Sequence, residues 1–238
     1  MNHKFLALAA LGALTLGACS TQDVPAPAPA DGDGTVTFSV AMPAAMQTRG
    51  YADGKQEKTL SYAVYDATTD ELVFASGDGT APEATGGPIK YELKLNLVKG
   101  KTYNFIFWAD AKDNTHYTFS AKDKTVTVNY TETDGKLTAT GNDDTRDAFF
   151  QAVKDVTISG PMTQDVELRR PFAQINFGTN DIKEAAAAKT EIAKTDLLVK
   201  GVYTKLNLLT GIASEAKDVT FTSDAFAAEG EEFPADKT

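Results

Sequence analysis

The sequence predicts a mainly β protein, built as a β-sandwich domain followed by a partial second β domain with one short helix. Two observations lead to this prediction. Short segments in which apolar and polar residues alternate recur along the chain, and glycine-rich or Asp/Asn-rich turns separate them. Only one stretch is alanine-rich and helical in character. With 238 residues, the chain has room for one large or two small domains.

The composition argues against several classes of partner and cofactor. The net charge is −10, which disfavours binding to nucleic acid or to anionic lipid surfaces. A single cysteine allows neither an internal disulfide framework nor a two-cysteine metal site. The two histidines, His3 and His116, are too far apart in the sequence to predict a histidine-based metal cluster. We therefore expect no cofactor and no bound metal.

Residues 1–18 have the layout of an export signal. Lys4 supplies positive charge, and the apolar run that follows it is shorter than the roughly 20 residues of a membrane-spanning helix. The run ends in Leu16-Gly17-Ala18-Cys19, which resembles the bacterial lipobox. That resemblance implies cleavage before Cys19 and lipidation of its thiol. The alternative, a buried N-terminal helix, does not explain why the only cysteine stands at this point.

Residues 19–34 predict a tether. Prolines alternate with alanine from Pro25 to Ala30, which favours extended and stiff backbone without a core. The Asp31-Gly32-Asp33-Gly34 sequence suggests a calcium loop, but it lacks the later carboxylate of that motif, so a solvated loop is the better interpretation.

A strictly alternating strand follows at residues 35–42. Val36, Phe38, Val40 and Met42 fall on one face, and Pro43 ends the strand because it has no N–H to donate. Burial of each of these side chains is worth about 1.5–3 kcal/mol, so their sum rivals the stability of a whole domain. A protein that lost this strand would need a replacement for it.

A polar stretch, residues 43–54, comes next and contains Arg49 followed by Gly50. An arginine in an exposed loop is a natural protease target. The alternative is an ordinary surface arginine, and spacing alone favours that interpretation.

The body of the chain contains further predicted strands. Their ranges are 60–65, 71–75, 89–97, 103–109, 125–130, 156–159, 165–168 and 172–177. The nearly continuous apolar run 103–109 predicts a central strand covered on both faces, with Trp108 in the core rather than on a sugar-binding surface. Asp144 and Asp147 suggest a metal or catalytic pair, but no base, nucleophile or further ligand accompanies them. Residues 143–152 are therefore predicted to be a polar loop that packs two phenylalanines inward. Arg169 and Arg170 are expected to pair with the acidic surface, as a structural brace rather than an anion site.

Residues 179–238 predict the partial C-terminal domain. A helix is expected at 182–194, capped by Asn180 or Asp181, with strands at 197–203, 205–209 and 219–221. These elements are too few to close a sandwich of their own. The domain is either incomplete or completed by another element.

Several segments together resemble the fimbrillins, or type V pilins, of Bacteroides-like bacteria. The likeness covers most of residues 16–212. Three features near the N-terminus contribute to it: the lipobox, the early strand and the arginine that follows this strand. Three segments of the body also contribute: Tyr103-Asn104-Phe105-Ile106-Phe107-Trp108-Ala109, Arg146-Asp147-Ala148-Phe149-Phe150 and Arg169-Arg170-Pro171-Phe172-Ala173-Gln174-Ile175-Asn176-Phe177.

The resemblance implies a specific way of assembly. Fimbrillins are outer-membrane lipoproteins with two β-sandwich domains of transthyretin-like topology. An arginine-specific protease removes their first strand, and a strand from the next subunit fills the groove to build an adhesive fibre. Carried over to this chain, Cys19 is the lipidated residue, Arg49 and Gly50 flank the cleaved bond, and residues 35–42 are the exchanged strand, with Val36, Phe38, Val40 and Met42 facing the groove.

The resemblance is incomplete at the C-terminus, where no apolar strand follows Glu231-Glu232-Phe233-Pro234. The expectation is either a truncated reading frame or a subunit that accepts a strand without donating one. A second hypothesis is a non-polymerising outer-membrane lipoprotein that binds glycan or another surface ligand. An enzyme is not expected, because no nucleophile–base pair, metal-ligand spacing or phosphate loop is present in the sequence.

Overall fold

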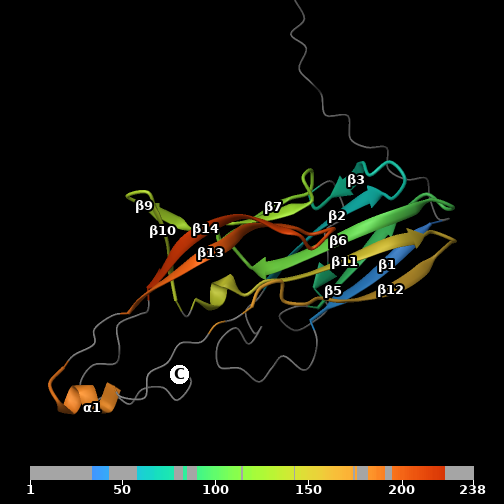
Figure 1. The fold of residues 1–238 in the computed structure, drawn as a ribbon. Coiled ribbons are helices and arrows are strands. Elements are labelled where there is room, and N and C mark those ends of the chain that lie inside the picture. The colour runs from blue at the N-terminus through green and yellow to red at the C-terminus, as the bar shows by residue number, and fades with distance from the viewer. Residues whose placement is uncertain are drawn as a thin grey trace, which may run out of the picture.

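The computed structural model describes residues 34–42, 58–77, 83–84, 90–113, 115–141, 143–173, 175, 182–190 and 195–222. Within these ranges the protein is mainly β and has a sandwich-type fold, as the sequence predicts (Figure 1). The predictions for Cys19, Arg49 and Gly50 fall outside the described residues.

The described elements are fourteen strands, a single turn of 3-10 helix and one short α-helix. They are β1 (Thr35–Ala41), β2 (Lys58–Asp66), β3 (Leu72–Ala75), β4 (Glu83–Ala84), β5 (Lys90–Asn96), β6 (Thr102–Ala111), β7 (Tyr117–Ser120), β8 (Thr125–Val128), β9 (Thr131–Thr133), β10 (Lys136–Thr140), η2 (Asp144–Arg146), β11 (Phe149–Thr157), β12 (Met162–Glu167), α1 (Ile182–Ala187), β13 (Asp196–Asn207) and β14 (Ala213–Thr222).

The strands form three sheets. The first has the order β12-β1-β5-β4, the second β11-β6-β2-β3, and the third β7-β8-β13-β14-β10-β9. Two hydrophobic cores join them. One core lies between the first and second sheets, and the other between the second and third. The β11-β6-β2-β3 sheet is therefore the middle layer of three (Figure 1).

Strand β6 explains why the middle layer is covered on both sides. Its side chains alternate between the two cores: Phe105 and Phe107 belong to the first, and Ile106 and Trp108 to the second. All four are at most 1% exposed. The predictions of a central strand and of a core role for Trp108 are thus confirmed. A strand that is apolar on both faces requires a layer on each side.

Strand β1 lies inside the first sheet. It pairs with β5 in antiparallel orientation and with β12 in parallel orientation. Val36, Phe38 and Val40 point into the first core and are 0% exposed. Met42, directly after the strand, is partly buried against the same core. The strict alternation in the sequence thus matches a sheet with one buried face.

The C-terminal strands do not form a sheet of their own. Strand β13 pairs with β8, and β14 pairs with β10. The expected division at residue 178 therefore cuts through one six-stranded sheet. The physical reason is the one that the sequence raises: residues 179–238 have too few strands to bury an apolar face, and strands from earlier in the chain complete their sheet.

Several predicted boundaries were wrong. Residues 149–157 form the strand β11 rather than a loop followed by a short strand. The strands expected at 197–203 and 205–209 are one continuous strand, β13, which a bulge between Val199 and Val202 bends. Phe172, Ala173 and Ile175 lie outside any strand. The strands β4, β7, β9 and β10 were not predicted.

The helix α1 is shorter than predicted. It begins at Ile182 as expected but ends at Ala187. Lys189 adopts a left-handed conformation with φ of 58°, and the N–H of Thr190 donates to the carbonyl of Ala185 at 2.8 Å. This pattern is typical of a helix C-cap, where a residue with positive φ closes the last turn. No helix of the described segments is long and apolar enough to cross a membrane.

We predict that Phe38→Ala lowers the free energy of unfolding of the uncut protein by about 3–5 kcal/mol, because a fully buried ring is lost without room to repack. Urea unfolding at equilibrium measures this change. Ser39→Ala is the matched control on the other face of β1 and should change stability by less than about 0.5 kcal/mol. A loss below about 1 kcal/mol for Phe38→Ala would show that β1 is not part of the core.

Candidate functional site

The candidate site is the place that β1 occupies in the first sheet. Val36 lies opposite Leu95 of β5 and Met162 of β12. Two residues further on, Phe38 lies opposite Leu93 and Gln164, and then Val40 opposite Tyr91 and Val166. Without β1, the strand β12 would have no strand partner among the described residues, and β5 would keep only the two-residue β4. The position of β1 is thus a slot with a hydrogen-bonding strand on each side.

Phe38 sits at the centre of this slot. Its ring lies 4.7 Å from the ring of Phe105 and 5.2 Å from that of Phe107, both in tilted orientations. Phe105 and Phe107 are themselves stacked at 6.5 Å with an interplanar angle of 10°. Aromatic contacts in this range add about 0.5–1.5 kcal/mol each to the burial of the rings. The floor of the slot is therefore aromatic at its midpoint.

The residue that opens the strand is Gly34. Its carbonyl accepts a hydrogen bond from the N–H of Leu97 at 3.0 Å. A Cβ added at Gly34 would lie 1.9 Å from the carbonyl oxygen of Leu97 and 3.3 Å from a methyl group of Ile158. From the sequence alone, Gly34 is predicted to belong to the tether. The structure places it at the mouth of the slot, where only glycine fits.

The other end of β1 meets a corner between two sheets. The N–H of Leu168 donates to the carbonyl of Ala41 at 2.8 Å. The next residue, Arg169, exchanges two backbone hydrogen bonds with Phe150 of β11 at 2.8 and 2.9 Å. The segment after β12 is thus tied to the middle sheet by bonds that do not involve β1.

A buried charged cluster reinforces this corner. The guanidinium of Arg170 binds the carboxylate of Asp147 with two hydrogen bonds, Nε to Oδ1 at 2.7 Å and Nη2 to Oδ2 at 3.0 Å. Lys58, the first residue of β2, donates from Nζ to the backbone carbonyl of Asp147 at 2.9 Å. Both cations lie over the ring of Phe149, Arg170 at 5.0 Å and Lys58 at 5.9 Å from its centroid. Arg170 therefore acts as a brace as predicted, but its partner is buried.

Burial perturbs the acid–base behaviour of this cluster. It lowers the pKa of Lys58, against the opposing effect of the carboxylates of Asp147 and Asp110. It raises the pKa of Asp147, which the hydrogen-bonded Arg170 opposes. Asp110, near the end of β6, has its pKa raised from 3.8 to about 6, again chiefly by burial. These shifts follow from the loss of water around the charged forms. The positive charges of Arg170 and Lys58 partly offset this loss for the carboxylate of Asp147.

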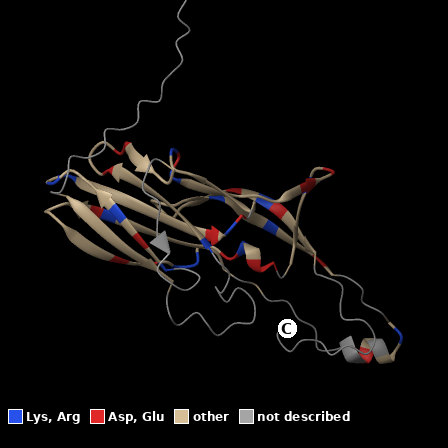
Figure 2. Ribbon diagram, turned by 180° about the vertical axis from the view of Figure 1, so that it is seen from behind, with Lys and Arg blue, Asp and Glu red and all other residues tan. Residues whose placement is uncertain are grey.

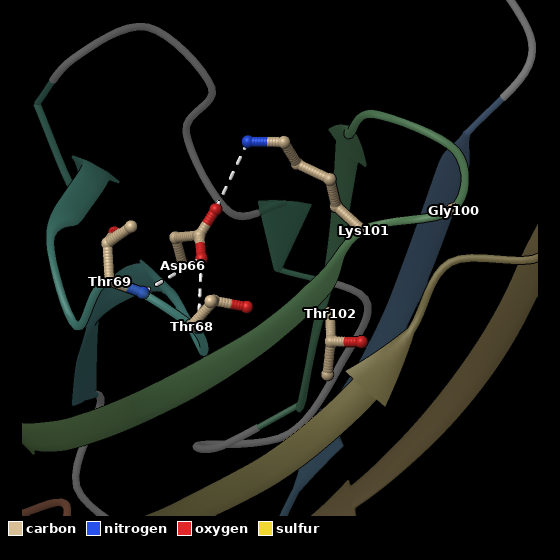
Figure 3. A pocket seen from close by; sticks show the side chains of 6 residues that line it. All are labelled: Asp66, Thr68, Thr69, Gly100, Lys101 and Thr102. Atoms are coloured by element: carbon tan, nitrogen blue, oxygen red, sulfur yellow. Dashed lines mark hydrogen bonds and ion pairs between the residues drawn. The ribbon is translucent and has the colours of Figure 1, made fainter.

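A surface hollow of about 350 Å³ lies at the far end of β2 and β6 and is lined by Asp66, Thr68, Thr69, Gly100, Lys101 and Thr102 (Figure 3). The carboxylate of Asp66 accepts from the N–H groups of Thr68 and Thr69 at 2.9 and 3.2 Å, and Nζ of Lys101 lies 3.1 Å from it. The N–H of Thr68 is the largest of the influences that lower the pKa of Asp66. This is the geometry of a turn closed by an ion pair, and its polar groups satisfy one another.

The polar group around His116 does not have the geometry of a catalytic triad. Its Nε2 lies 2.9 Å from the hydroxyl of Thr145 and 3.0 Å from the carboxylate of Asp143. A triad needs the nucleophile and the carboxylate on different ring nitrogens, so that one orients the ring while the other loses its proton. No group of three or more His, Cys, Asp or Glu side chains in the described part of the chain could hold a metal ion.

The structure brings together some of the residues singled out in the sequence. Val36, Phe38, Val40 and Met42 contribute to one core, and Asp147 and Arg170 meet in one buried pair. Sequence reasoning missed Gly34 and Lys58. A glycine directly before an alternating strand was an available signal for the first. A lysine at a strand start gave no signal for the second, because its burial depends on a carbonyl contributed from the distant residue Asp147.

In the comparison with protein families, a family described as a family of unknown function, DUF6562, matches residues 28–234. The chain belongs to this family. The matched region of this DUF6562 member includes Gly34, all of β1 and both strands that flank it. No curated protein and no solved structure shows significant similarity to the chain.

We predict that Asp147→Asn lowers the free energy of unfolding by about 3–5 kcal/mol, because the buried Lys58 and the half-buried Arg170 lose the negative charge of this carboxylate. Chemical unfolding at pH 7 checks this. Lys101→Ala, which breaks the solvent-screened ion pair with Asp66, is the control and should have a much smaller effect. Equal effects of the two substitutions would contradict a structural role for the charged cluster.

We also predict a pH dependence that comes from Asp110. Well below pH 3.8 its carboxyl is protonated in both the folded and the unfolded state, so it contributes nothing. Between about pH 4 and pH 6 the unfolded state releases its proton first, and stability is lost as pH rises. The free energy of unfolding of Asp110→Asn, relative to that of wild type, should therefore increase by about 1–3 kcal/mol as the pH rises from 4 to 7.

Urea unfolding of both proteins at pH 4 and pH 7 measures this difference. Asp113→Asn is a suitable control, since Asp113 is exposed and lies just after β6. A difference between Asp110→Asn and wild type that stays constant with pH would contradict the prediction.

Proposed function

We propose that this protein is a fimbrial structural or accessory subunit. It is exported as a lipoprotein, anchored in the outer membrane through Cys19, and assembled by strand exchange after an arginine-specific protease cleaves between Arg49 and Gly50. The single observation that carries the proposal is the position of β1. It is an N-terminal strand in the interior of a sheet, with a fully buried apolar face.

The topology makes β1 separable from the rest of the protein. Only residues 43–57 connect it to β2, so a cut at Arg49 would leave it held by hydrogen bonds and packing alone. Burial of Val36, Phe38 and Val40 is worth roughly 5–9 kcal/mol in total, which is comparable to the stability of a domain. The cut protein would therefore keep β1 until another strand took its place.

A neighbouring subunit can supply such a strand. Strand addition uses main-chain hydrogen bonds for affinity and side-chain pockets on alternate residues for specificity. The slot of β1 offers both, with free hydrogen-bonding edges expected on β5 and β12 once it is empty. The tether expected at residues 19–33 would hold the subunit at the cell surface through Cys19, so the exchange would take place there and support adhesion.

The charged cluster supports the same proposal. Arg170, Asp147 and the backbone pair Phe150–Arg169 fix the end of β12 to the middle sheet without help from β1. A subunit that empties its slot needs such a fixed border, because β12 otherwise loses its strand partner. The fold thus retains one edge of the slot by an independent set of bonds.

We predict that the mature protein purified from its native surface begins at Gly50, and that Arg49→Ala instead leaves a chain that begins at lipidated Cys19. Intact-mass and N-terminal peptide mass spectrometry distinguish the two. Lys55→Ala is the control for cleavage that is specific to arginine and should leave the Gly50 terminus unchanged.

A wild-type terminus at Cys19 with no fibre would contradict assembly by strand exchange. It would favour the alternative of a surface lipoprotein that binds glycan without polymerising.

A further inference from the structure

We propose that the slot of β1 selects a strand of the pattern Gly-x-aliphatic-x-aromatic-x-aliphatic from a partner polypeptide, running parallel to β12. This inference rests on the strand exchange proposed above. It adds the chemistry of the partner strand, which the shape of the slot specifies at four positions.

The aromatic position is set by the floor of the slot. The ring of Phe38 contacts the stacked pair Phe105 and Phe107, and both of these are fully buried. A small side chain here would leave a cavity between them, since the interior cannot collapse around two stacked rings that β6 holds. The incoming strand therefore needs an aromatic residue at its centre.

The two aliphatic positions are set by the walls. Val36 lies between Leu95 and Met162, and Val40 lies between Tyr91 and Val166. Val36 and Val40 are both 0% exposed. Side chains of valine size fill these positions, and a charged side chain would be buried there without a partner.

The glycine position restricts the choice of residue more strongly than the other three. It lies two residues before the first aliphatic position, as Gly34 does before Val36. The approach of a Cβ to within 1.9 Å of the carbonyl oxygen of Leu97 excludes every other residue unless the backbone shifts. Such a shift would break the hydrogen bond between the N–H of Leu97 and the carbonyl of residue 34.

The backbone direction follows from the borders of the slot. The strand must pair in parallel with β12 and in antiparallel with β5 to satisfy both. The reverse direction would also place the glycine away from Leu97. The outward positions, where β1 has Thr35, Thr37 and Ser39, are half-buried and polar, and they impose no comparable demand.

The pattern narrows the choice of partner. Residues 223–238 do not contain it: the glycine of this segment, Gly230, is followed by Glu231 and Glu232, which puts a carboxylate at the first aliphatic position. That segment of a second copy is therefore not the ligand that we propose. The probe that matches the pattern is a peptide with the sequence of β1 itself.

The test uses the full chain with a specific protease site placed between residues 43 and 57, so that it does not depend on Arg49. The protein is cut and β1 is removed in denaturant. The body is then refolded with a fluorescent peptide of residues 33–42, and capture is measured by anisotropy and native mass spectrometry. The peptide variants are Phe38→Ala, Gly34→Val and, as the matched control, Ser39→Ala.

We expect capture of the wild-type and Ser39→Ala peptides with similar affinity. Affinity should fall roughly 100-fold or more for Phe38→Ala and roughly tenfold or more for Gly34→Val. Equal capture of all four peptides would overturn the selection that we propose while leaving strand exchange intact. Failure of the refolded body to capture any peptide would overturn both.

A separate arm tests the proposed function alone. The natively cut protein, with β1 still in place, is mixed with the wild-type peptide and followed over time. Replacement of β1 supports strand exchange. Selective capture on refolding without any replacement in the native cut protein would contradict the proposed function and keep the selectivity of the slot.

Discussion

The structure depends on strand β6, which is apolar on both faces and cannot contact water on either. Phe105 and Phe107 require one layer, and Ile106 and Trp108 require another. The first requirement is met by β1, β5 and β12. The second is met by the six-stranded sheet, to which the C-terminal strands β13 and β14 contribute. Distant parts of the chain are therefore held together by one central strand (Figure 1).

The two layers differ in how they are joined to the body. The strands of the six-stranded sheet come from several parts of the chain. Among the described elements, β1 is linked to the rest of the protein only through residues 43–57, which lead to β2.

Charged pairs on the surface contribute little to stability. Positive and negative residues are interspersed over the described segments (Figure 2). Their exposed pairs, such as Lys205–Glu215 at 3.0 Å, contribute at most about 1 kcal/mol each. The pair of Arg170 and Asp147 is different, since its carboxylate is only 4% exposed and its guanidinium 17% exposed.

Periodicity predicted the elements whose burial follows a regular pattern along their length. The alternation in residues 35–42 and the continuous apolar run at 103–109 state directly which faces are covered, and the structure agrees with both. Short polar strands escaped prediction because their pairing, rather than their composition, makes them strands: β9 has the sequence Thr131-Glu132-Thr133 and is exposed throughout. The position of Gly34 and the burial of Lys58 also depend on residues far away in the sequence. The burial of Lys58 has no local pattern in the sequence, whereas Gly34 at least stands directly before an alternating strand.

The parallel pairing of β1 with β12 has a consequence for the order in which the protein folds. Val36 is made early, but its partner Met162 is made much later, and the sheet cannot close until both are present. Pairings between residues so far apart are slow to form, because the loop between them must first be ordered. The first of the described strands to be synthesised is thus among the last to be placed. Until β1 is placed, its slot is open. A strand of matching sequence from another polypeptide could therefore enter the slot during folding in place of β1.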